Sequence, residues 1–129
     1  MSTYPALNLG SLPVSRINAT IGTSLAPGEV TVSKAAHAHI ALDHPTEYPA
    51  IMAALANIVA NPAFVGQDPK HPHAFYLVEA VTSPLGSHAL VAIGFQRDKT
   101  GHYRVKSAYA LKASQFAGRL QTGRLVPLT

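Results

Sequence analysis

The chain has 129 residues, 47% hydrophobic and 12% charged, which favours one folded domain over a disordered segment. Its net charge is +4 and its isoelectric point about 9.6, which fits a polyanionic partner but does not require one. There is no cysteine, which excludes disulfides and thiolate chemistry. No apolar run approaches the roughly 20 residues that span a bilayer, and no signal peptide is recognisable.

Residues 1–28 carry little charge and are interrupted repeatedly by proline and glycine. We therefore expect an N-terminal arm or linker remnant at 1–28, followed by a single domain at 29–129. Alternating apolar residues predict a short strand at Val14–Ile21 within this arm, and Glu29–Val32 reads as a second short strand.

The first expected helix runs from about Lys34 to Asp43 and has Ser33 as its N-cap. The stretch Ser33–Pro45, which includes this helix, contains three of the seven histidines. At about 100° per residue, His37 and His44 fall on nearly the same face and His39 on the other. The three cannot meet one ligand on a regular helix. The pattern therefore favours a single histidine used for proton transfer or anion binding.

A second helix is expected from a cap at Thr46 to Ala60, with Pro49 in its first turn and Asn61-Pro62 at its end. Its apolar stripe predicts a core-facing side. The stripe consists of Ile51, Leu55, Ile58 and Val59.

Beyond Pro62 the hydrophobic period changes to that of strands. We expect strands at Ala74–Val81, Ala89–Phe95 and His102–Ala110. Short turns at Ser83–Ser87 and Gln96–Gly101 imply an antiparallel meander with a buried central strand. Leu111–Leu120 fits either a helix or an edge segment. The predicted fold is α+β, with two N-terminal helices on one face of a three- to four-stranded antiparallel sheet.

The strand at His102–Ala110 is strongly basic. Residues 97–124 hold seven of the ten basic residues and only one acid, Asp98. Strict alternation places His102, Arg104 and Lys106 on one face, and Tyr103, Val105, Ser107 and Tyr109 on the other. Such a cationic row suits a phosphate backbone, although a solvated sheet face would look the same. The row is extended by Arg97 and Lys99 in the preceding turn and by Lys112, Arg119 and Arg124 beyond the strand.

A polar loop precedes the first strand of the meander, where binding residues often lie. Its candidates for substrate binding are Lys70, His71 and His73, and the alternative is an ordinary solvated loop. Two histidine pairs have HxH spacing, but no acidic residue is obviously placed to complete a zinc site, so we expect no metal. There is no Walker loop, dinucleotide fingerprint or nucleophile elbow.

What remains is a set of single histidines, cations and tyrosines. That set suffices for RNA cleavage by attack of the 2′-hydroxyl on its own phosphate. The reaction needs a base, an acid and positive charge near the phosphorane. The substrate itself supplies the nucleophile.

The stretches HAHIALDHP, NIVANPAFVG, FYLVEAV, ALVAIGF and HYRVKSAYALK follow one another in an order that resembles the barnase–EndoU–colicin–RelE superfamily of small ribonucleases. The likeness runs from about Val30 to Leu120 and is closest to the phage-associated and polymorphic-toxin branches. It implies a ribonuclease toxin that needs no metal or cofactor and acts on tRNA or other RNA. It also implies delivery to the cytoplasm of a target cell within a larger secreted or phage-borne protein, and neutralisation by an immunity protein or antitoxin.

The resemblance assigns catalytic roles to His39 and His44, and to residues of the late strand. Arg104 and Lys106 would bind phosphate and stabilise the transition state. The other late-strand residues, Ser107 and Tyr109, would orient the scissile group. Whether His37 or His39 faces the cleft stays open, and no paired glutamate identifies the base.

Other functions remain open. A module of the same fold could bind RNA without cleaving it, or serve as a phage structural component. An NAD-using transferase toxin is a further alternative, and a zinc hydrolase is the weakest.

Overall fold

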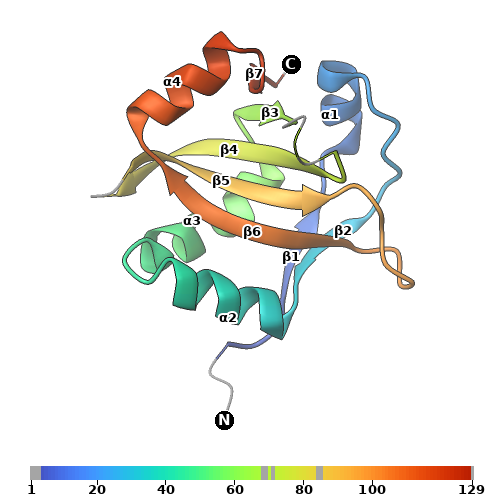
Figure 1. Cartoon of the computed structure of the whole chain (residues 1–129). Coiled ribbons are helices and arrows are strands. Elements are labelled where there is room, and N and C mark those ends of the chain that lie inside the picture. The colour runs from blue at the N-terminus through green and yellow to red at the C-terminus, as the bar shows by residue number, and fades with distance from the viewer. Residues whose placement is uncertain (1–3, 68–69, 71, 84–85, 129) are drawn as a thin grey trace.

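The computed structural model describes residues 4–67, 70, 72–83 and 86–128 (Figure 1). Within these residues the chain forms an α+β fold of four helices and a seven-stranded open sheet of mixed, mostly antiparallel strands. The strand order is β1-β2-β6-β5-β4-β3-β7. The elements in chain order are β1 (Leu7–Ser11), α1 (Val14–Ile21), β2 (Glu29–Val32), α2 (Lys34–Asp43), α3 (Tyr48–Ala60), β3 (Phe64–Gly66), β4 (Ala74–Ser83), β5 (Gly86–Gly94), β6 (Tyr103–Leu111), α4 (Ala113–Gln121) and β7 (Val126–Pro127).

The central meander β4-β5-β6 confirms the prediction, and β5 is buried on both faces for most of its length. The sheet is nevertheless larger than the expected three to four strands, and it is not purely antiparallel because β2 pairs in parallel with β6. Strands β3 and β7 have three and two residues, too few for an alternation to be visible in the sequence.

The N-terminal region does not form an arm. Strand β1 pairs with β2, and Leu12 and Ile17 lie in the main core. The strand predicted at Val14–Ile21 is wrong, because this segment is α1, ended by Gly22 in the left-handed conformation. Its apolar residues also recur at helical spacing, and tertiary burial of Ile17 decides between the two periods.

Helices α2 and α3 confirm the sequence reading. Ser33 caps α2 by accepting a hydrogen bond from the Ala36 N–H at 3.1 Å. The predicted apolar stripe of α3 is fully buried. The helix begins at Tyr48 with Glu47 at its N-cap position, one residue later than the expected cap at Thr46.

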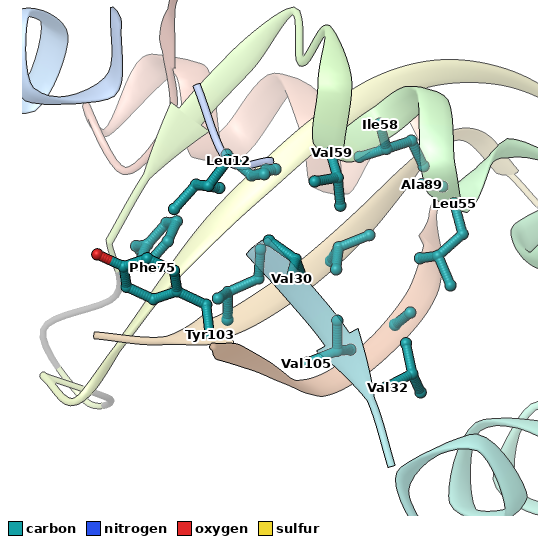
Figure 2. Packing of buried hydrophobic residues seen from close by; sticks show 14 of the residues in the cluster. Leu12, Val30, Val32, Leu55, Ile58, Val59, Phe75, Ala89, Tyr103 and Val105 are labelled. Carbon is teal, nitrogen blue, oxygen red and sulfur yellow. The ribbon is translucent and has the colours of Figure 1, made fainter. Parts of the chain in front are cut away.

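Two cores lie on the two faces of the sheet, since consecutive residues of β4 and β5 belong alternately to one or the other. Helices α1, α2 and α3 cover the larger core, part of which Figure 2 shows around Val30, Val105 and Leu55. We call this side the three-helix face. Only α4 among the helices covers the smaller core, and we call that side the α4 face. The two predicted helices, α2 and α3, share one face of the sheet as expected. Helix α4 covers the opposite face, and Leu111–Leu120 is mostly helix rather than an edge segment.

Candidate functional site

A β-bulge in β6 determines which side chains meet on the α4 face. Val105 pairs with Ile93, and Ser107 pairs with Ala92, so Lys106 is an extra residue on its strand. Strict alternation is thereby broken. Lys106 and Ser107 both reach the α4 face, contrary to the prediction that they point to opposite faces.

The α4 face carries a groove where α4 leaves the sheet uncovered. Its central hollow of about 400 Å³ is lined by Lys70, Pro72, His73, Ala74, Tyr76, Ala92, Lys106, Ser107 and Tyr109. A second hollow of about 530 Å³ shares His73 and Lys106 with it and continues past Gly94. A third, of about 430 Å³, shares Tyr109 and continues beneath α4. The structure thus brings together five of the residues predicted for the site.

Gly94 makes room for Lys106. A Cβ atom built on Gly94 would lie 2.9 Å from Cε of Lys106, so the lysine stem crosses the bare backbone of β5. The adjoining loop is fixed by a 2.9 Å hydrogen bond from the Phe95 N–H to the carbonyl oxygen of His73. These contacts place Lys106 and His73 at the same end of the central hollow.

His44 lies at the other end, beside Tyr109. The centroids of their rings are 5.8 Å apart. Glu47 links α2 to β6 at this end. Its Oε2 accepts a 2.9 Å hydrogen bond from the Ala110 N–H and lies 3.6 Å from Nδ1 of His44, and we call this arrangement the Glu47 corner. Strand β2 pairs with β6 only at Tyr103 and Arg104, so the carboxylate caps a β6 edge that β2 does not reach. Sequence reasoning missed Glu47, although its position three residues after His44 was visible.

The other histidines of α2 lie elsewhere. His37 is 4% exposed, and its ring nitrogens contact the carbonyl oxygen of Pro5 at 2.8 Å and the hydroxyl of Tyr48 at 2.6 Å. His39 is exposed and contacts Asp43 at 2.9 Å. Neither lines any of the three hollows. The structure therefore places His44, and not His37 or His39, next to the groove.

Arg104 points to a different centre, the β5–β6 turn. Its Nε lies 3.1 Å from Oδ2 of Asp98. Hydrogen bonds from the Thr100 side chain, the His102 backbone and Arg104 hold the pKa of Asp98 well below its usual range. His102 also contacts Thr100 at 2.6 Å, and Arg97 donates to the carbonyl oxygen of Pro27.

Arg97 and His102, which were predicted to bind substrate, form a separate cationic turn together with Lys99. This turn adjoins the groove near Gln96. Lys112 is exposed at the start of α4. His71 lies outside the described residues.

Helix α4 and the residues after it contribute further side chains, among which only Arg119 and Arg124 were expected, as extensions of the cationic row. Phe116 stacks on His88 with centroids 3.6 Å apart, and burial lowers the pKa of His88. Arg119 lies over the ring of Tyr76, and Arg124 lines the same hollow as Arg119. The basic residues after β6 were visible in the sequence, but their side of the sheet was not.

Within the part of the chain that the structure describes, no three His, Cys, Asp or Glu side chains gather as potential metal ligands. The same part contains no helix long and apolar enough to cross a membrane. Searches against protein-family models, curated proteins and solved structures find no match to this chain.

Proposed function

We propose that this protein binds single-stranded RNA in the groove of the α4 face and cleaves it in the central hollow without a metal ion. The observation that carries the proposal is the bulge at Lys106. It collects an ammonium, the hydroxyls of Ser107 and Tyr109, and the imidazole of His73 in one hollow. Cations with neighbouring aromatic rings are the usual components of a single-strand binding surface.

The hollow offers proton-transfer groups at both ends. His73 lies where it adjoins the second hollow, and Tyr109 lies where it adjoins the third, with His44 against the tyrosine ring. The group at one end takes the proton from the 2′-hydroxyl, and the group at the other end gives a proton to the leaving 5′-oxygen. The bond from the 2′-oxygen to phosphorus forms as the bond to the 5′-oxygen breaks. The products are a 2′,3′-cyclic phosphate and a free 5′-hydroxyl.

Lys106 lies at the His73 end of the hollow, and Ser107 follows it on β6; both face the phosphate in this arrangement. The ammonium offsets the negative charge that accumulates on the phosphorane oxygens, and the serine hydroxyl donates a hydrogen bond to one of them. Glu47 orients His44 through the corner that it forms with β6. This proposal moves the chemistry away from His39, which the resemblance favoured, and from His37, which helical geometry had left open.

Incubation of the purified chain with total RNA in excess EDTA tests the proposal. Fragments that end in 2′,3′-cyclic phosphate are expected, and their cut sites define the substrate. RNA that is bound with steep salt dependence but stays intact would leave a binding module of the same fold. RNA that is neither bound nor cut would overturn both functions.

A further inference from the structure

Arg119 belongs to the last turn of α4, and its side chain lines the third hollow. Its guanidinium carbon lies 5.3 Å from the centroid of the Tyr76 ring. The backbone carbonyl of Arg119 accepts hydrogen bonds from the Leu125 N–H at 3.1 Å and from the Thr122 hydroxyl at 3.3 Å. The backbone that carries this arginine is therefore fixed at the rim of the groove.

One nitrogen of the Arg119 guanidinium, Nη1, is buried without a polar partner in the part of the chain that the structure describes. None of the ion pairs formed within the same residues includes Arg119. A buried charged donor without a partner is costly, and native structures usually satisfy such a group with a ligand, an ion or water.

The hollow beside it is suited to an anion. Its lining includes Arg119, Arg124, Thr122 and Gln115, and no acidic side chain belongs to it. Tyr109 forms the wall shared with the central hollow. A group bound here would therefore lie next to the proposed cleavage site.

We propose that this third hollow is a phosphate subsite, in which Arg119 and Arg124 bind the RNA phosphate that neighbours the scissile one. The planar guanidinium fork matches two phosphate oxygens and would give the buried nitrogen its partner. Tyr76 supports the guanidinium from below. This inference rests on the proposed function, since it assigns the ligand to RNA.

The test uses a 2′-O-methyl hexanucleotide, which has no 2′-hydroxyl and cannot be cleaved. Its Kd is measured against salt concentration for the wild type, Arg119→Met and Arg16→Met. Arg16 is exposed on α1, which belongs to the three-helix face, so this variant matches the loss of charge outside the groove. Arg119→Met should weaken binding and reduce the slope of log Kd against log salt by about 0.7, the value for one phosphate of a single strand. Arg16→Met should leave the slope unchanged.

Unfolding temperatures separate binding from structure. Methionine keeps an apolar stem over Tyr76 and leaves no donor unpaired, so Arg119→Met should not unfold at a lower temperature than the wild type. A lower unfolding temperature with an unchanged salt slope would assign Arg119 a structural role and overturn the subsite.

If the wild type binds no oligonucleotide, the proposed function fails separately. Titration of the wild type with inorganic phosphate then decides whether the hollow takes an anion at all. Movement of the Arg119 Nε–H resonance would support an anion site for free phosphate. A resonance that does not move would overturn it.

Discussion

Three histidines on one short segment have three different environments. His37 is buried between the Pro5 carbonyl and the Tyr48 hydroxyl, His39 is exposed beside Asp43, and His44 lies at the Glu47 corner. Helical geometry predicted that His37 and His44 share a face. It did not reveal that this face is buried in the core at His37 and adjoins the groove at His44.

Replacing Tyr48 by phenylalanine tests the structural role of His37. One ring nitrogen of a buried histidine loses its 2.6 Å partner, so the free energy of unfolding should fall by about 1–3 kcal/mol. Urea titration measures this loss. The rate of RNA cleavage under native conditions should stay unchanged, and a fall in rate without a fall in stability would instead implicate His37 in the chemistry.

Gly94→Ala tests the position of Lys106. The new methyl group would meet Cε of Lys106, the flexible end of a side chain, so stability should change by less than about 1 kcal/mol. Displacement of the ammonium should nevertheless slow cleavage roughly 10- to 100-fold. Thermal unfolding and single-turnover kinetics on the same sample check both parts. Full activity in this variant would remove Lys106 from the site.

Among the elements, β6 and α4 determine the groove, and neither was fully predictable. The bulge inserts one residue, and nothing in HYRVKSAYALK marks where the register slips. The helical pattern of residues 111–120 is weak, and α4 is stabilised because Phe116 packs on Phe64 and His88, which belong to two different strands. Such long-range contacts have no local signal in the sequence.

Attachment of α4 should depend on pH through His88. Burial lowers its pKa in the folded chain below the ordinary value of 6.5, and the charge of Glu79 opposes this shift. Between the folded pKa and 6.5 the unfolded chain binds more protons. The contribution of uncharged His88 to the free energy of unfolding is therefore complete above pH 6.5, and it is lost as pH falls toward the pKa of His88 in the folded chain.

Unfolding measured from pH 7.5 to pH 5 in the wild type and His88→Phe isolates this effect. Phenylalanine keeps a ring against Phe116 but carries no proton, so the variant should lose less stability on acidification. Parallel pH profiles for the two proteins would show that His88 does not contribute.

At the scale of the whole molecule, the sequence predicted β2, α2, α3 and the meander β4-β5-β6 but missed β1, α1, β3 and β7. The long periodic segments α3, β4, β5 and β6 are found close to where they were expected. The margins of the sheet consist of short strands whose pairing partners are distant, such as β3 with β7. Their apolar residues are too few to reveal a period, and burial against the remainder of the fold determines their structure.

Ile17→Ala tests whether the N-terminal region is integral to the core. Ile17 has no exposed surface and belongs to the main cluster, so its truncation should cost about 2–5 kcal/mol of unfolding free energy. Ile21→Ala, at a partly buried position of the same helix, is the matched control and should cost less. Equal and small losses would indicate that α1 is only loosely attached.

We propose that RNA is cleaved in the hollow that the β6 bulge forms. The most direct measurement compares single-turnover cleavage of a short RNA in EDTA by Lys106→Gln and Arg104→Gln, two losses of charge on one strand. Lys106 lines the central hollow, whereas Arg104 pairs with Asp98 at the turn. We predict a loss of about 100-fold or more for Lys106→Gln and a much smaller one for Arg104→Gln. An equal loss, or a larger one for Arg104→Gln, would contradict the assignment of cleavage to this hollow.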